Sequence, residues 1–210
     1  MNHPVMPIAP GRQIIAHLAG ALLACGLLSS CGDSSPTSAE RPPLEGAAIG
    51  GDFELVDSAG KTVRASDFDG KYRMVYFGYA YCPDVCPFDL QRMMQGYRQF
   101  AEEHPGRAAE VQPIFITVDP ERDTPEVVGE FTANFGDNLM GLTGTPEQIA
   151  EAAKAFSVYY AKGEESAGGG YLMDHSRAAY LMGPQGDPIA LLPVEANGPE
   201  VAAELNKWVS

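Results

Sequence analysis

Two cysteines separated by three residues restrict the fold of this chain more than any other feature. Cys82 follows an apolar run, Met74 to Gly78, and Cys86 lies near the start of a segment, Val85 to Glu103, in which apolar residues recur at helical spacing. Asp84 suits the N-cap position of that helix, which places Cys86 in its first turn and Cys82 just before it. We therefore expect both sulfurs at the junction of a buried strand and a helix.

Strand and helix patterns alternate along the rest of the chain. A hairpin is predicted ahead of the first central strand, and further strands, helices and a closing helix follow it. The other predicted strands are residues 53–56, 61–64, 114–118, 178–182 and 189–192, with a further strand after Phe156, and the later helices are predicted to begin at Thr124, Thr145 and Gly198. This order predicts an α/β domain with a thioredoxin-like fold, an N-terminal β-hairpin and an inserted helix near residues 145–155.

The first 31 residues have the pattern of an export signal. Arg12 precedes an apolar run from Ile14 to Leu28, which is shorter than the about 20 residues that a transmembrane helix needs. The run ends in Leu28-Ser29-Ser30-Cys31, which resembles the lipobox of bacterial lipoproteins and implies lipidation of Cys31. A soluble exported protein and an uncleaved anchor are the alternatives. We expect a lipid anchor in a bacterial membrane, with the domain in the periplasm or another extracytoplasmic space.

Residues 32–50 separate this signal from the predicted domain, residues 51–210. They consist mainly of Ser, Pro, Thr, Glu, Gly and Ala, a composition that predicts a flexible linker without an apolar face. The whole chain has a formal net charge of −14. That charge argues against nucleic-acid binding, because such binding needs Lys and Arg side chains against the phosphates.

Cys25 lies in the predicted signal and would be removed with it, and Cys31 would carry the lipid. Cys82 and Cys86 would then be the two cysteines available for chemistry. Three intervening residues, rather than the two of the usual thiol-exchange motif, let both sulfurs point at one ion. Soft thiolates select Cu(I), with Zn(II) as a competitor. The dipole and free N–H groups of the helix start favour a thiolate at Cys86. A structural disulfide is the alternative interpretation of the spacing.

His175 is the predicted third ligand. It comes just before the predicted strand 178–182, and in a thioredoxin-like fold the loop that enters this strand lies beside the cysteines. A neutral imidazole and two thiolates would complete a three-coordinate Cu(I) site. Asp119 and Asp84 are the candidates for supporting the ligands, although Asp119 equally suits a simple turn. The Gly-rich segment 163–170 predicts a histidine that swings to capture and release the metal.

The chain contains three notable segments in this order: Tyr76 to Pro87, Val118 to Pro125 and Gly170 to Ser176. Together they resemble the Sco/SenC family of copper-delivery proteins. The resemblance extends from about Ile49 to the C-terminus. It implies a metallochaperone that binds Cu(I), and in a second oxidation state Cu(II), through Cys82, Cys86 and His175. The implied partner is subunit II of cytochrome c oxidase or another copper-accepting oxidase. Because family members also exchange disulfides, Cys82 and Cys86 are expected to form a redox disulfide.

Small departures from the family leave the implied ligands in place. Phe88 stands where the family commonly has Thr, and Gly183 stands where Asp is common. We expect Phe88 to affect packing and access beside the site.

Two other functions stay open: a membrane-tethered thiol–disulfide oxidoreductase or peroxidase, and a copper or redox sensor. Thiol-exchange enzymes of the thioredoxin type carry a proline where this chain has His175, which favours metal binding over redox work alone.

Overall fold

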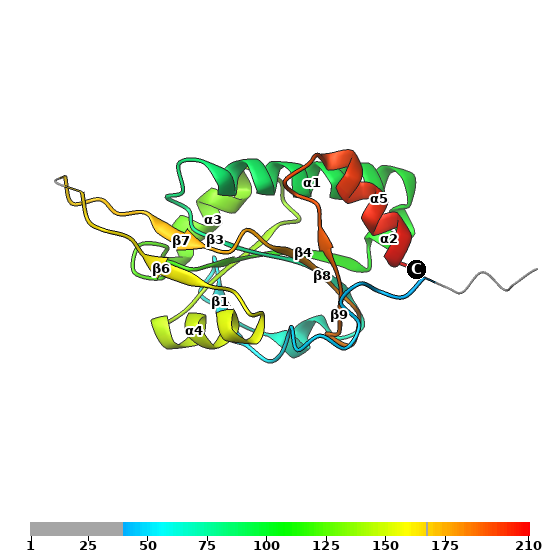
Figure 1. Ribbon diagram of the computed structural model, residues 1–210, viewed down its shortest axis with the longest axis horizontal. Helices are drawn as coiled ribbons and strands as arrows, with labels where there is room; N and C mark the ends of the chain where they lie inside the picture. Colours follow the sequence, from blue (N-terminus) through cyan, green and yellow to red (C-terminus); the bar gives the residue numbers. More distant parts are fainter. Residues whose placement is uncertain (1–39, 167) are drawn as a thin grey trace, which may run out of the picture. The chain divides into compact units, whose positions relative to one another are not determined.

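A seven-stranded mixed sheet forms the centre of the domain in the computed structural model (Figure 1). The structure describes residues 40–166 and 168–210. The sheet has the strand order β2-β1-β5-β4-β3-β8-β9, and β6 and β7 form a separate two-stranded sheet. The strands are β1 (Glu54–Asp57), β2 (Thr62–Arg64), β3 (Tyr72–Gly78), β4 (Val111–Thr117), β5 (Met140–Thr143), β6 (Tyr160–Lys162), β7 (Met173–His175), β8 (Ala179–Met182) and β9 (Pro188–Leu192).

Parallel pairing is confined to the middle of the sheet. β4 pairs in parallel with β3 on one side and with β5 on the other. β8 and β9 complete one edge with antiparallel pairing, and the β1–β2 hairpin joins the other edge through β5. This arrangement confirms the predicted α/β fold with an N-terminal hairpin.

Helices cover both faces of the sheet. Figure 1 shows α1, α2, α3 and α5 on one face and α4 on the other. α4 is the inserted helix that the sequence predicts. The helices are α1 (Val85–Glu103), α2 (Pro105–Ala108), α3 (Pro125–Ala133), α4 (Pro146–Ala155) and α5 (Gly198–Trp208), with a short 3-10 helix, η1 (Ala65–Phe68).

Side-chain caps explain where three of the helices begin. The Thr124 hydroxyl accepts a hydrogen bond from the Val127 N–H group at the start of α3. Thr145 and Gln148 exchange side-chain and backbone bonds of 2.8 and 3.3 Å at the start of α4. Asn197 caps α5 through the Glu200 N–H group, at 3.0 Å. These starts agree with the predicted ones.

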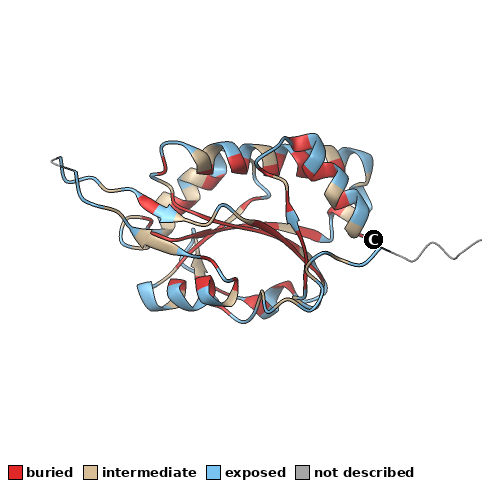
Figure 2. Cartoon of the chain, viewed as in Figure 1, coloured by how far each residue is buried: buried red, intermediate tan, exposed pale blue. Residues whose placement is uncertain are grey.

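The core lies against the central strands, which Figure 2 shows as almost continuously buried. Strands that are covered by helices on both faces place apolar side chains on both sides of the sheet. Tyr76 and Phe77 of β3 and Phe115 of β4 are among the largest fully buried side chains. The carboxyl end of β3 is therefore held firmly on all sides, and the loop that carries Cys82 leaves from this end.

The linker prediction needs a correction at its C-terminal part. Residues 40–50 pack on the domain: the Leu44 N–H group donates to the Ile189 carbonyl at 3.0 Å, and the Gly50 N–H group donates to the Ala155 carbonyl at 2.9 Å. Leu44 and Ile49 also contact the core. A composition dominated by small and polar residues concealed these two well-placed apolar side chains.

The predicted features of the N-terminus fall on residues 1–39, outside the described part of the chain. These are the signal peptide of residues 1–31, the lipid attachment at Cys31 and the first residues of the linker. Within residues 40–166 and 168–210, no helix combines the length and the apolar character that crossing a bilayer requires.

Candidate metal centre

The candidate metal centre lies where β3 leads into α1. Residues 79–84 form the connecting loop, and Asp84 occupies the N-cap position of α1 as predicted. The Asp84 side chain is exposed and makes no capping hydrogen bond, so it supports the site less directly than expected. Cys82 lies in this loop and Cys86 in the first turn of the helix, in agreement with the sequence analysis.

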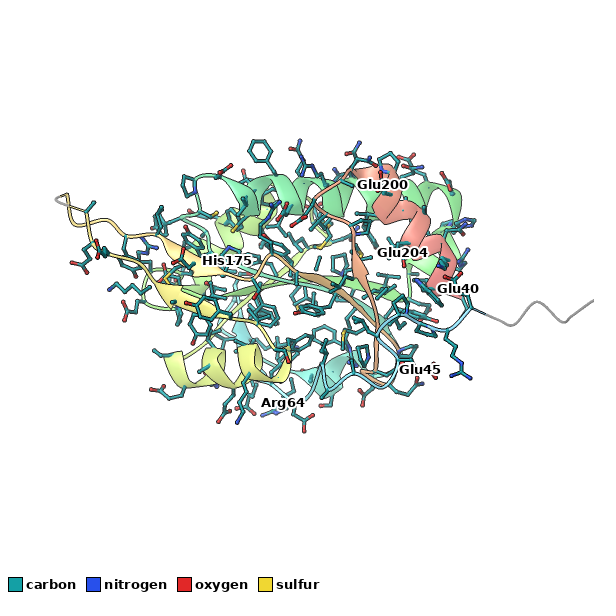
Figure 3. The ribbon with its side chains drawn as sticks, viewed as in Figure 1. Glu40, Glu45, Arg64, His175, Glu200 and Glu204 are labelled. Carbon is teal, nitrogen blue, oxygen red and sulfur yellow. The ribbon has the colours of Figure 1, made fainter. Side chains whose placement is uncertain are left out.

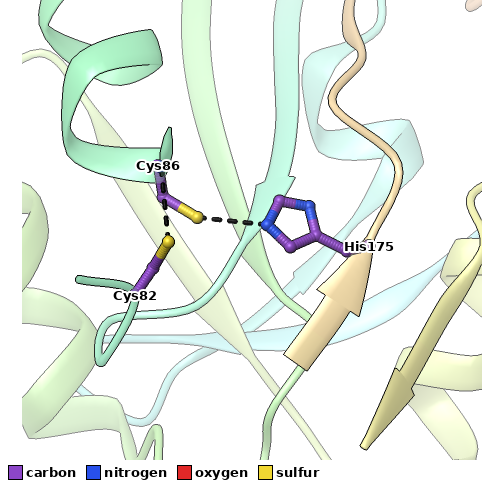
Figure 4. Close-up of side chains that lie close together, drawn as sticks. All are labelled: Cys82, Cys86 and His175. Carbon is purple, nitrogen blue, oxygen red and sulfur yellow. Dashed lines mark hydrogen bonds between the residues drawn. The ribbon is translucent and has the colours of Figure 1, made fainter. Parts of the chain in front are cut away.

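Cys82, Cys86 and His175 converge on one point (Figure 4). Their two sulfurs and one ring nitrogen all lie within 4.8 Å of one another. The Cys86 Sγ and the His175 Nε2 are 3.2 Å apart, and the Cys86 N–H group donates to the Cys82 Sγ at 3.4 Å. Both cysteines carry free thiols. The sequence therefore located all three side chains of this cluster correctly.

The three residues of the site differ in how far they are buried. Cys86 is fully buried, Cys82 is 8% exposed, and His175 is half-buried. Figure 3 shows His175 at the end of the domain that carries the β6–β7 hairpin, away from Glu200 and Glu204 on α5. An ion or a partner group therefore meets Cys82 before it meets Cys86.

Local hydrogen bonds place the thiolate on Cys82 rather than on Cys86, which corrects the sequence-based expectation. A hydrogen bond from Cys86 and others from backbone N–H groups lower the pKa of Cys82 well below the usual value of a thiol, despite burial. The pKa of Cys86 is raised, because its thiol donates to Cys82 and because it is buried. The free N–H groups of the helix start face the sulfur just ahead of the helix, not the one inside its first turn.

The orientation of His175 leaves one ring nitrogen free to bind a metal. Its Nδ1 lies 3.0 Å from the carbonyl oxygen of Ser176, which can only accept a hydrogen bond. Nδ1 therefore carries the ring proton, and the lone pair of Nε2 points toward the sulfurs. Tyr76 and Tyr79 meet the His175 ring edge-on, with ring centroids 6.4 and 5.9 Å away.

Asp119 stabilises the segment that leads into β7. Its buried carboxylate accepts a hydrogen bond from the Tyr171 hydroxyl at 2.8 Å and forms a 2.5 Å ion pair with Arg122. Arg122 in turn donates to the Tyr171 carbonyl at 2.9 Å, and its guanidinium lies 3.6 Å from the centroid of the Tyr171 ring. Asp119 thus secures the chain just before β7 and makes no contact with the three donor atoms.

The strand β7 and a buried carboxylate were missed by sequence reasoning. His175 was expected in a loop, but it is the last residue of β7 and pairs with Tyr160 of β6. Asp89 is fully buried on α1 and binds Tyr76 and Arg177. Asp89 follows Cys86 by three residues, on the same apolar face of the helix, and an acidic residue at such a position requires a partner.

Phe88, which was expected to affect packing and access beside the site, lies on the exposed face of α1. Its side chain is 54% exposed, whereas the neighbouring Asp89 and Leu90 are fully buried. The helix therefore turns Phe88 toward solvent and its neighbours toward the core.

Gly78 is the residue at which a single methyl group is expected to disturb the site. A Cβ atom there would lie 3.0 Å from the Cys86 Sγ and 2.9 Å from the Tyr76 ring. We expect Gly78→Ala to weaken Cu(I) binding by about 10-fold, the loss typical of disturbed ligand support. Competition with a chromophoric Cu(I) chelator measures this, with Gly168→Ala as the control because a Cβ at Gly168 meets only open space and one distant hydroxyl. Equal affinities for both variants would contradict the expectation.

Comparison with known proteins identifies the family. The SCO1/SenC family model matches residues 41–210. The chain belongs to the SCO1/SenC family. The mitochondrial SCO2 homolog of Bos taurus is 44% identical over 144 residues, which cover 68% of this chain and 53% of that protein. Protein SenC of Rhodobacter capsulatus is 46% identical over 142 residues, 66% of this chain and 61% of that protein. The chain thus spans little more than half the length of the bovine relative.

Solved structures of SCO1/SenC relatives share the fold and include copper complexes. Bradyrhizobium japonicum ScoI with copper bound has 37% sequence identity and a TM-score of 0.69, covering 76% of this chain and 99% of that one. Yeast Sco1 with copper bound has 32% identity and a TM-score of 0.70, covering 77% and 88% of the two chains.

The donor set fits a soft monovalent ion. Two sulfurs and a neutral imidazole nitrogen are the ligands that Cu(I) prefers over harder divalent ions. The three donors come from two separate segments, and the fold brings them within 4.8 Å of one another. Their spacing therefore suits binding to a single Cu(I) ion.

Proposed function

We propose that this SCO1/SenC chain is a copper metallochaperone that holds Cu(I), and on oxidation Cu(II), through Cys82, Cys86 and His175. The observation that carries the proposal is the convergence of their three donor atoms within 4.8 Å. Copper bound in the related ScoI and Sco1 structures supports it. Binding and release by ligand exchange need no covalent turnover, so the chain is a carrier rather than an enzyme.

The proposed recipient is the copper centre of cytochrome c oxidase subunit II, or of another copper-accepting oxidase. Transfer begins at Cys82, because this sulfur is the more exposed of the two. A thiolate of the recipient replaces Cys82 first, and the buried Cys86 and His175 release the ion afterwards. This order keeps copper bound to at least one soft ligand throughout.

Thiol–disulfide exchange with the recipient is a second candidate function. The two free thiols are neighbours, hydrogen bonds lower the pKa of Cys82, and Cys82 is the more exposed of the two, so this sulfur is the nucleophile of the pair. In the reducing step, the Cys82 thiolate attacks a disulfide of the recipient and forms a mixed disulfide. Cys86 then displaces the recipient's sulfur, which leaves the recipient as a dithiol and the Cys82–Cys86 pair oxidised.

We also propose a lipid anchor at Cys31. The lipobox-like segment Leu28 to Cys31 supports a bacterial lipoprotein whose domain works outside the cytoplasm. With residues 40–50 packed on the domain, a tether of residues 32–39 would separate it from the membrane.

Deletion of the gene in its own bacterium tests the delivery function. The copper content of the purified oxidase is expected to fall, because no carrier supplies its copper centre. Added copper and the wild-type gene should both restore it, whereas a Cys86→Ser gene should not. Cys86 is chosen because it is fully buried and lies 3.2 Å from His175. An oxidase with its full copper content in the deletion strain would refute the proposal.

A further inference from the structure

An ion pair between a buried carboxylate, Asp89, and a partly exposed guanidinium, Arg177, joins the two segments that supply the proposed metal ligands. Asp89 is three residues after Cys86 on α1, and Arg177 is two residues after His175. The Arg177 Nε and Nη2 atoms donate to the two carboxylate oxygens of Asp89 at 2.9 and 2.6 Å. This two-point contact fixes the direction of both side chains as well as their distance.

The carboxylate of Asp89 depends on this contact. Asp89 is fully buried, and its remaining contacts are the Tyr76 hydroxyl at 3.1 Å and a distant Arg92 at 4.0 Å. A buried carboxylate without a close cation is strongly unfavourable, so the fold holds Arg177 against α1. The chain that follows β7 is thereby tied to the helix that carries Cys86.

Tyr76 links this ion pair to the histidine ring. Its hydroxyl donates to Asp89, and its ring meets the His175 ring edge-on at a centroid distance of 6.4 Å. On the other side of β7, Tyr171 is held by Asp119 and Arg122. His175 therefore lies between two anchored points, Tyr171 and Arg177, and the Gly-rich segment 163–170 precedes Tyr171 in the sequence.

We infer that the Asp89–Arg177 pair is a positioning device, which holds His175 at the sulfurs before copper arrives. The inference deepens the proposed function and depends on copper binding at that site. It replaces the expectation of a swinging histidine, because an anchored ring needs no rearrangement to bind the ion. Neither residue touches the three donor atoms, so both act through the backbone and through Tyr76.

A double-mutant cycle on the chain purified in detergent tests this inference. Arg177→Ala is expected to weaken Cu(I) binding about 10-fold, the loss typical of groups that orient a ligand. The same change in a His175→Ala background should cause no further loss, because there is no ring left to position. Arg177→Lys, which keeps the charge but not the two-point contact, should fall between Arg177→Ala and the wild type.

NMR of the metal-free chain measures the mobility of the His175 ring independently of copper affinity. The ring signals of His175 should report a rigid ring in the wild type and a mobile one in Arg177→Ala. A double variant, Asp89→Leu with Arg177→Leu, leaves no unpaired buried charge and guards against simple unfolding. It should remain folded and lose affinity as Arg177→Ala does.

Arg107→Ala is the matched control. Arg107 also joins two segments, from α2 to the end of α5, but it lies beyond the C-terminal end of α1, opposite the metal centre. Its removal should leave copper affinity unchanged. The inference is overturned if folded Arg177→Ala or the double Leu variant binds Cu(I) like the wild type, or if the loss persists in the His175→Ala background. If the chain does not supply copper to an oxidase but the double-mutant cycle gives the expected result, only the delivery function is refuted.

Discussion

His175→Ala is expected to weaken Cu(I) binding by more than about 100-fold, beyond the loss usually caused by residues that merely orient a ligand. The change removes the ring nitrogen that lies 3.2 Å from the Cys86 Sγ and leaves two sulfurs as the remaining donors of the cluster. Competition with a chromophoric Cu(I) chelator under reducing conditions measures the affinity. Cys86→Ser should cause a loss at least as large, because a hard hydroxyl replaces a soft sulfur.

His104→Ala is the control for this prediction. His104 caps the C-terminal end of α1, and its ring packs on Phe100 at a centroid distance of 5.4 Å. The same side-chain truncation, one helix length from the metal centre, should leave copper affinity unchanged. Wild-type affinity in His175→Ala would rule out the three-ligand site and leave a protein with a bare pair of thiols.

The convergence of the three ligands could be predicted because it follows from topology. An apolar run that leads into a helical pattern places Cys82 and Cys86 at the end of a central strand, wherever the rest of the chain lies. The strand that follows His175 pairs with that same central strand, through Tyr76 and Ala179. The fold class therefore specified the neighbourhood of the histidine before any distance was known.

Short strands were harder to predict because their pairing partners define them. β5 has four residues and β7 has three, and neither was predicted, whereas a strand was expected after Phe156, where β6 lies. Such segments show no clear alternation, and they become strands only when a neighbour supplies their hydrogen bonds. For this reason the histidine was expected on a flexible loop, although β7 pairs it with Tyr160.

The support of the ligands was partly visible in the sequence. Asp89 stands among the apolar residues Leu90 and Met93 on the buried face of α1, which signals a paired charge. The sequence could not say that Arg177 is its partner, since the two residues are separated by 88 positions. The location of the thiolate likewise depends on which sulfur the helix N–H groups face, and only coordinates show this.

Gly96→Val is expected to lower the free energy of unfolding by about 3 kcal/mol, the upper part of the range for overpacking a core. Gly96 lies in the middle of α1, where α5 passes so closely that a Cβ atom would be 2.5 Å from the Val201 Cβ and 2.6 Å from the Gly198 carbonyl oxygen. One obstacle is backbone and the other is the branch point of a side chain, so neither can rotate away. The added methyl groups therefore force the two helices apart.

Gly106→Ala separates this packing effect from the general effect of replacing a helical glycine. Gly106 lies in α2, and a Cβ atom there meets no other atom within 4 Å. This substitution should be neutral or stabilising by up to about 1 kcal/mol, because alanine favours the helix over glycine. Urea unfolding followed by circular dichroism measures both variants. Equal midpoints for Gly96→Val and the wild type would show that α1 and α5 do not pack as closely as described, and the scaffold that positions Cys86 would then need a different explanation.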